Sequence, residues 1–153
     1  MGERLPAHQI RREQVADWLR DSANKRVTYH CTHRRAALSI VETGIDISRS
    51  RTGAFGQGFY TSTTPDPFYG EVEVTVAVRL VRPLVGELVE LDERMIELAR
   101  RLGSDHLTTE IAGAIRGRLV REGYDGIIVG NGGGDGVDLV VALLADRVKV
   151  LVT

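Results

Sequence analysis

Two aromatic pairs flank a proline-punctuated turn in the stretch TGAFGQGFYTSTTPDPFY, residues 52–69. Gly56 and Gly58 precede the first pair, Phe59–Tyr60, and glycine lets a backbone take strained angles or approach a ligand closely. Phe68–Tyr69 form the second pair. We expect the two tyrosines to offer ring faces between which a flat heteroaromatic ring can stack. A hairpin whose aromatic side chains only fill the core is the alternative.

Two more residues have side chains suited to chemistry. His30 lies in the middle of the strand-like segment RVTYHCT, and Asp138 opens the apolar run DLVVALL after a glycine-rich loop. Taken singly, each has a structural interpretation, because a strand histidine is often a satisfied core residue and an aspartate before a strand often bonds nearby backbone. With Tyr60 they form a candidate catalytic set of a histidine, a tyrosine and a carboxylate.

The order of these segments along the chain resembles a known enzyme class. YHCT, then GAFGQGFY, then YDGIIV with a glycine loop and DLVVALL, resembles the ADP-ribosyltransferases of the diphtheria-toxin and poly(ADP-ribose) polymerase class, whose signature is a His–Tyr–Glu triad. The aspartate in third place is similar to a bacterial toxin branch of that class. The resemblance runs from residue 27 to residue 150, and residues 52–62 are its most specific part.

The distribution of helical and strand patterns along the chain predicts an α+β fold with mostly antiparallel pairing. The resemblance adds the expectation of a split β core with flanking helices. The chain would form a single domain over residues 1–153, with an N-terminal helical segment at residues 1–25.

At the nicotinamide end of NAD, the resemblance implies roles for four residues. Tyr60 would stack on the nicotinamide ring, with Tyr69 against its other face. The backbone at Cys31 would bond the nicotinamide amide, and Gly58 would let backbone amides approach the ligand. Cys31 departs from the glycine found in much of the class, so the backbone there is less free.

At the riboses and phosphates, the resemblance implies a second group of contacts. His30 would hold the nicotinamide-side ribose through a hydroxyl, and Thr32 would contact the adenosine-side ribose. Arg51, or alternatively Arg49, would meet the pyrophosphate. Asp138 would occupy the place of the catalytic glutamate; it is one methylene shorter, which moves the carboxylate by about 1.5 Å.

The implied activity is that of an NAD-dependent mono-ADP-ribosyltransferase, a glycosyltransferase. Breaking the nicotinamide–ribose bond builds an oxocarbenium-like cation, as in glycoside cleavage. A carboxylate bonded to the ribose 2′-hydroxyl orients the ring and stabilises that cation. We expect NAD as substrate, no metal, a protein or nucleic-acid acceptor, and a cognate inhibitor protein as a further partner, as for a bacterial toxin or effector.

Two other functions stay open. The first is a NAD glycohydrolase or a catalytically weak NAD-binding module, in which Tyr60 is kept while Asp138 is misplaced. The second is a 2H-type phosphoesterase, because residues 30–32 and 106–108 are both His-x-Thr. The apolar spacing from Leu107 onward predicts a helix there, whereas the phosphoesterase class needs its second motif on a strand.

Bulk composition agrees with one ordinary globular domain. The 153 residues carry a formal net charge of −1, which predicts no general attraction to nucleic acid or anionic membrane. Cys31 is the only cysteine, which excludes an intrachain disulfide and fits a reducing compartment. No apolar run reaches the roughly 20 residues of a membrane span. We expect a cytoplasmic protein without membrane association, or one delivered into a target cell.

Residue patterns predict the elements that position these side chains. Helical spacing favours helices at residues 9–25, 34–43, 92–102 and 107–121. β-branched and alternating patterns favour strands at residues 26–32, 59–63, 71–80 with an extension at 84–91, 124–129, 138–144 and 147–152. Gly44, Gly103 and Gly123 follow predicted helix ends.

Overall fold

The structure, a computed structural model, describes residues 4–49 and 52–152. The strands of the main sheet are β1 (Gln9–Arg11), β2 (Thr28–Thr32), β5 (Phe59–Ser62), β6 (Val72–Val78), β7 (Pro83–Glu87), β8 (Gly126–Gly130), β9 (Leu139–Ala142) and β10 (Val148–Val152). A separate ribbon pairs β3 (Thr52–Gly53) with β4 (Gly56–Gln57). The helices are α1 (Arg12–Trp18), α2 (Arg34–Thr43), α3 (Leu88–Arg101) and α4 (Thr109–Arg121), with 3₁₀ turns η1 (Ile47–Arg49), η2 (Pro67–Tyr69) and η3 (Ala145–Arg147).

Within the described residues the fold is α+β, as predicted. The sheet has eight strands in the order β1-β10-β6-β2-β5-β9-β8-β7. The outermost pairs, β1–β10 and β7–β8, are parallel. The other pairings are antiparallel, so the mostly antiparallel character expected from the sequence is confirmed.

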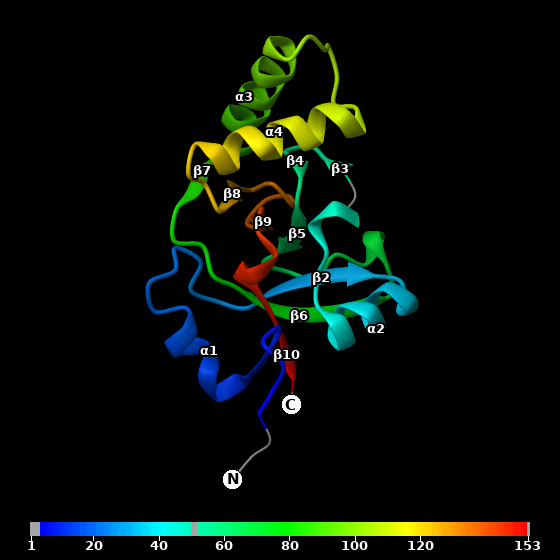
Figure 1. Cartoon of the computed structure of the whole chain (residues 1–153), viewed down its shortest axis with the longest axis vertical. Coiled ribbons are helices and arrows are strands. Elements are labelled where there is room, and N and C mark those ends of the chain that lie inside the picture. Colours follow the sequence, from blue (N-terminus) through cyan, green and yellow to red (C-terminus); the bar gives the residue numbers. More distant parts are fainter. Residues whose placement is uncertain (1–3, 50–51, 153) are drawn as a thin grey trace.

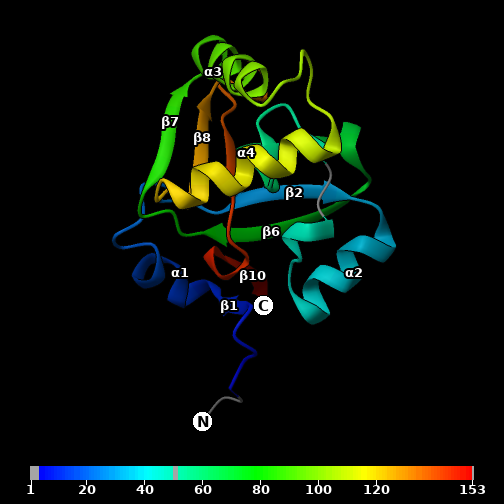
Figure 2. The same ribbon diagram turned by 45° about the horizontal axis from the view of Figure 1, so that its top comes forward.

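The sheet is strongly twisted, with helices at both ends of the molecule (Figure 1). Strands β7 and β8 run crosswise to β2 and β6 (Figure 2). One hydrophobic cluster packs α2 against β6, β5 and β9, while a second lies between α3, α4 and the strands β7, β8 and β9. Strands β5 and β9 contribute alternate residues to both clusters, so the two clusters lie on opposite faces of these strands.

The predicted helix at residues 34–43 is confirmed, and its ends are set locally. The His33 side chain accepts a hydrogen bond from Ala36 N (3.3 Å), which caps the first turn. Gly44 ends the helix with a φ of 88°, a conformation that favours glycine.

The predicted helix over residues 9–25, and with it the helical segment at 1–25, is wrong in extent. Residues 9–11 form β1, which pairs in parallel with β10 through Ile10 and Leu151. The helix α1 covers only Arg12–Trp18. The apolar residues that suggested a longer helix, Ile10 and Leu19, are instead buried in a small cluster with Ala77 of β6. Long-range strand pairing therefore overrides the local helical pattern.

The predicted strand extension at residues 84–91 is also wrong in its second half. Strand β7 ends at Glu87, and α3 begins at Leu88 rather than at residue 92. The buried residues of α3 are Leu91, Met95, Leu98 and Ala99, which have helical spacing. The helical period therefore begins one turn earlier than the sequence pattern indicated.

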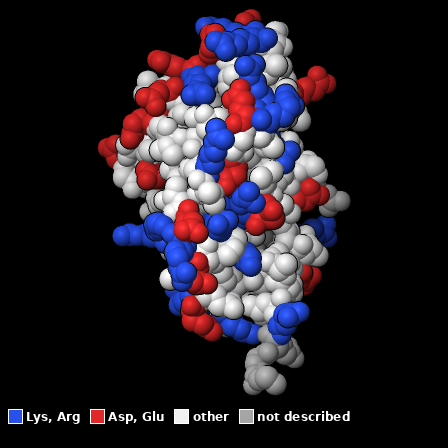
Figure 3. Space-filling model, turned by 60° about the vertical axis from the view of Figure 1, so that its left-hand side comes forward, with Lys and Arg blue, Asp and Glu red and all other residues white. Residues whose placement is uncertain are grey.

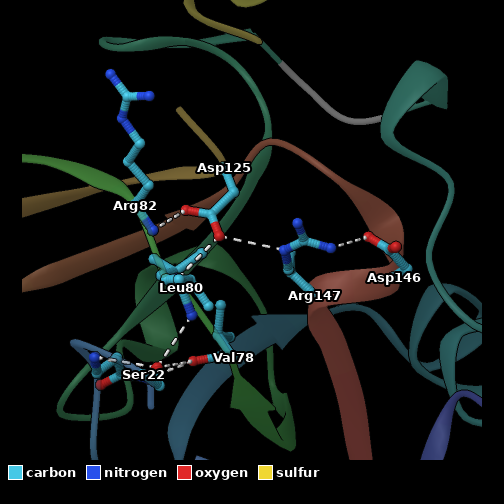
Figure 4. A network of polar contacts seen from close by, with 9 residues as sticks. Ser22, Val78, Leu80, Arg82, Asp125, Asp146 and Arg147 are labelled. Carbon is cyan, nitrogen blue, oxygen red and sulfur yellow. Dashed lines mark hydrogen bonds and ion pairs between the residues drawn. The ribbon is translucent and has the colours of Figure 1, made fainter. Parts of the chain in front are cut away.

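A buried carboxylate fixes the segment that leaves β6 for β7. Asp125 is 4% exposed and accepts hydrogen bonds from the backbone N–H groups of Val81 (2.8 Å) and Arg82 (3.0 Å) and from Arg147 Nε (3.2 Å) (Figure 4). On the other side, Ser22 Oγ accepts from Leu80 N at 2.9 Å. Side chains from Asp125 and from Ser22 therefore both hold the segment that connects β6 to β7.

None of the helices in the described ranges combines the length and apolarity that a membrane span needs.

Candidate functional site

Three neighbouring strands carry or adjoin the predicted catalytic residues. Strand β5, with Tyr60, lies between β2, with His30, and β9, which begins directly after Asp138. The backbone of Asp138 is joined to the end of β5, because Thr63 N donates to Asp138 O (3.0 Å) and Asp138 N donates to Thr63 Oγ1 (3.0 Å). Segments separated by 75 residues are thus adjacent at one place in the sheet.

The seam between β2 and β5 is nearly unpaired. In the described part of the chain, β2 pairs with β6 at every position from Thr28 to Thr32, whereas it pairs with β5 only between Tyr29 and Ser62. Beyond that position the Tyr60 carbonyl contacts the His30 imidazole, with Nδ1 at 2.7 Å from the oxygen. The His30 side chain here replaces the backbone N–H of a neighbouring strand as the hydrogen-bond donor to the Tyr60 carbonyl. A backbone carbonyl that is shielded from water requires such a donor.

His30 is a neutral imidazole with one defined tautomer. Burial lowers its pKa below the usual 6.5, and the hydrogen bond to the Tyr60 carbonyl opposes that shift. Since a carbonyl oxygen only accepts, Nδ1 carries the proton and Nε2 is an acceptor. The ring is stacked on Phe59, with centroids 4.3 Å apart. No group among the described residues bonds to Nε2, so this atom is available to a hydroxyl donor.

Tyr60 is fixed on the face of the sheet opposite His30. Phe59 belongs to the α2 side of the core, whereas Tyr60 packs against the α3–α4 side. Its hydroxyl donates to Gly56 O (2.6 Å) and accepts from Phe55 N (3.0 Å). A Cβ on Gly53 would lie 2.3 Å from Tyr60 Cζ, so the ring lies directly against the ribbon β3–β4. Burial raises the pKa of Tyr60, and the phenol remains protonated. The half-buried ring is suited to stacking rather than to proton transfer.

The glycines before Tyr60 pack against protein. A Cβ on Gly58 would lie 2.6 Å from Val141 Cγ1 in β9. Gly56 has a φ of 96° and lies against Ile115 of α4. The sequence predicts close approach of a ligand at Gly58, but in the structure the space beside its Cα is occupied by the neighbouring strand.

Turn η2 rests against the end of β2. A Cβ on Gly70 would lie 2.2 Å from the backbone carbon of Thr32, so the two segments touch through their main chains. Tyr69 is 66% exposed and Phe68 is 86% exposed, and their rings meet edge to face at 5.3 Å. Cys31, a free thiol beside Thr32, is half-buried. An exposed aromatic pair therefore adjoins the strand that carries His30.

The carboxylate of Asp138 points toward the hairpin loop that precedes it. Oδ1 accepts a hydrogen bond from Asn131 N (3.0 Å). Among the contacts of the described residues, none joins this carboxylate to the side chain of His30 or Tyr60. The three residues are thus neighbours through their strands and not through direct side-chain contact.

Sequence reasoning missed two residues that hold Asp138, namely Asn131 and Thr63. Asn131 lies two residues after the predicted strand at 124–129, and an asparagine next to glycine is a turn signal that points to this position. Thr63 shows no comparable signal, because its role depends on the pairing of β5 with β9.

Arg51, the predicted pyrophosphate contact, lies outside the described residues. Two exposed cations, Arg34 and Arg35, open α2 just after Thr32.

The second His-x-Thr motif lies far from the first. His106 is exposed in the connection between α3 and α4, which lies at the opposite end of the molecule from α2 and away from β2 (Figures 1 and 2). The Thr108 hydroxyl accepts from Ile111 N (3.2 Å) and caps α4. A 2H-type site, which needs both motifs on adjoining strands, does not form.

Residues 4–49 and 52–152 also contain no group of three or more acidic, histidine or cysteine side chains arranged to hold a metal ion.

Comparisons with known proteins add little. No protein-family model and no curated protein matches the chain. A solved structure described as an anti-CRISPR protein is similar over 82% of this chain and 94% of its own, with 18% identity and a TM-score of 0.40. At that level the likeness assigns neither a family nor a function.

Proposed function

We propose that this chain is an NAD-dependent mono-ADP-ribosyltransferase that cleaves the nicotinamide–ribose bond and transfers ADP-ribose to a macromolecular acceptor. The observation that carries the proposal is the nearly unpaired border between β2 and β5. The two strands at this border carry a neutral histidine with an available acceptor nitrogen on one face of the sheet and an immobilised tyrosine ring on the other, and an aspartate adjoins the next strand. NAD that contacts both side chains must therefore cross the border between β2 and β5. The resemblance of the sequence to this enzyme class supports the same reading.

At the nicotinamide end, the aromatic residues supply the binding surface. Tyr60 has both hydroxyl bonds satisfied within the protein, which leaves its ring to stack on the nicotinamide. Tyr69, exposed beside the end of β2, covers the other face. A pyridinium cation over such a ring gains about 1 kcal/mol. The backbone at Cys31 bonds the nicotinamide amide.

At the ribose end, hydroxyl recognition depends on His30 and Thr32. The His30 Nε2 accepts from a hydroxyl of the nicotinamide-side ribose, and Thr32 contacts the adenosine-side ribose. Asp138 bonds the ribose 2′-hydroxyl and stabilises the positive charge that develops as nicotinamide leaves. Its shorter side chain reaches the ribose only if the ligand or the hairpin loop lies closer than in an enzyme with glutamate.

The acceptor is a protein or a nucleic acid, and surface charge favours neither. The face shown in Figure 3 intersperses basic and acidic side chains, in keeping with the formal net charge of −1. Water competes for the same cation, so some NAD glycohydrolase activity accompanies transfer. The proposal further includes a cytoplasmic site of action and, as for a bacterial toxin, a cognate inhibitor protein.

The test uses NAD labelled separately in its adenylate and nicotinamide parts. The protein is incubated with each in cell lysate, beside Asp138→Ala and the control Asp135→Ala, which changes an exposed acid in the same loop. We expect nicotinamide release and adenylate label on macromolecules for the wild type and Asp135→Ala only. Release without attached label would assign a glycohydrolase, and binding without release would assign an NAD-binding module. The absence of both binding and release would refute the proposal.

A further inference from the structure

Asn131 has an unusual backbone conformation. Its φ of 58° is the only positive φ of a non-glycine residue in the described ranges. Side chains with a Cβ rarely adopt this left-handed conformation, although asparagine tolerates it better than most. Strained positions of this kind tend to be kept where surrounding structure requires them, often at functional sites. Asn131 begins the loop between β8 and Asp138.

The backbone and side chain of Asn131 make four hydrogen bonds. Its backbone N–H donates to Asp138 Oδ1 (3.0 Å), and its Nδ2 donates to Glu87 Oε2 (3.0 Å). Its Oδ1 accepts from Gly136 N (2.9 Å), and its carbonyl accepts from Gly134 N (3.1 Å). Glu87 ends β7, and its carboxylate fills the space beside Gly130, where a Cβ would lie 2.6 Å from Glu87 Oε1. Asn131 thus joins the sheet edge to both ends of the loop.

We infer that Asn131 is a positioning residue for Asp138, an inference that depends on the proposed function. Thr63 fixes the backbone of Asp138 from one side, and the Asn131 N–H fixes Oδ1 from the other. No described residue bonds to Oδ2, which is therefore the oxygen presented to the ribose 2′-hydroxyl. A carboxylate held in this way needs no reorientation when the cation develops.

The left-handed backbone is what aims the N–H at Asp138. In Asn131→Ala, alanine disfavours a φ near 58°, and the side-chain bonds to Glu87 and Gly136 are lost. In Asn131→Gly, the side-chain bonds are lost equally, but glycine adopts the same φ without penalty. The pair of variants therefore separates the backbone donor from the side chain.

The experiment measures NAD cleavage by the wild type, Asn131→Ala and Asn131→Gly. Misplacing a catalytic group by about 1 Å can lower a rate on the order of 100-fold. We expect Asn131→Ala to lower kcat by about 10-fold to 100-fold with KM for NAD within about 2-fold, and Asn131→Gly to recover most of kcat. Gly103→Ala is the matched control, because it places alanine at a positive φ of 85° after α3, where its Cβ meets no atom within 4 Å.

The outcomes separate this inference from the proposed function. If the wild type releases no nicotinamide, the proposed function fails and the inference fails with it. If the wild type is active and Asn131→Ala keeps its kcat, or Asn131→Gly loses as much kcat as Asn131→Ala, only the inference is overturned. Melting temperatures of all variants, and normal kcat in Gly103→Ala, show that a lowered kcat does not come from general destabilisation.

Discussion

Burial holds His30 neutral, because it lowers the pKa of the imidazole by more than the hydrogen bond to the Tyr60 carbonyl raises it. In the unfolded state, the His30 imidazole takes up a proton as the pH falls through about 6.5. In the folded state it is protonated only at a lower pH, because burial lowers its pKa. Between these two values the unfolded state binds more protons, so stability decreases as the pH falls below about 6.5.

This pH dependence is testable with His30→Asn, which keeps a donor for the Tyr60 carbonyl and removes the titrating ring. We expect urea unfolding to show a larger loss of stability between pH 7.5 and 5.5 in the wild type than in the variant. An identical loss in both proteins would show that folding does not lower the pKa of His30.

Tyr60 is expected to act through its ring. Tyr60→Ala should weaken NAD binding and turnover together, because it removes the stacking surface. Tyr60→Phe keeps the ring and leaves Gly56 O and Phe55 N without their partner, so it should lower stability by about 1–3 kcal/mol while NAD affinity stays within about 3-fold. Calorimetric titration with NAD and urea unfolding measure both effects. Unchanged binding in Tyr60→Ala would mean that Tyr60 only fills the core.

The sequence pointed to candidate site residues where the residue type itself has a side chain suited to the proposed reaction. His30, Tyr60 and Asp138 were identified from residue type and motif order, and the structure shows that their strands are neighbours. The tautomer of His30 and the packing role of Gly58 were not predictable, since each depends on a partner from a distant strand.

At the scale of elements, the contact between η2 and β2 positions the exposed aromatic pair. In Gly70→Ala the new Cβ would lie within 2.2 to 2.4 Å of Thr32 backbone atoms, so η2 must move away from β2. We expect a higher KM for NAD, because Tyr69 moves with the turn. The matched control is Gly113→Ala within α4, whose Cβ meets nothing closer than 3.7 Å and which should stabilise the helix by about 0.5–1 kcal/mol. An unchanged KM in Gly70→Ala would exclude η2 from the NAD site.

Elements whose limits depend on nearby residues were predicted well, and others were not. Helix α2 ends at Gly44, the glycine that the sequence pattern placed at its C-terminal end. Residues 9–11 form a strand only because β10 pairs with them, and β10 lies more than a hundred residues further along the chain. Local pattern carries no information about such a partner.

At the scale of the whole molecule, Asp125 links the segment between β6 and β7 to Arg147 near β10. Asp125→Ala leaves two backbone donors and a partly buried guanidinium without their acceptor. We expect a loss of roughly 3–5 kcal/mol in the free energy of unfolding. The control Asp146→Ala removes the exposed partner of the same arginine and should cost less than about 1 kcal/mol. Equal losses in urea unfolding would contradict this role for Asp125.

The α+β class followed from the distribution of helical and strand patterns along the chain, but the strand order did not. Strand β2 pairs with β6 and β5, yet β6 continues by way of residues 79–82 to β7 at the far edge of the sheet. Only contacts such as those of Asp125 determine that path, and a single sequence does not reveal them.

The nearly unpaired border between β2 and β5 has a consequence for hydrogen exchange. Amide protons of β2 that face β6 belong to a continuous ladder and should exchange slowly with deuterium. Those that face β5 beyond Tyr29 lack such protection and should exchange quickly in the absence of ligand. NAD that occupies the border would slow their exchange, so deuterium uptake along one strand would report ligand occupancy without any turnover.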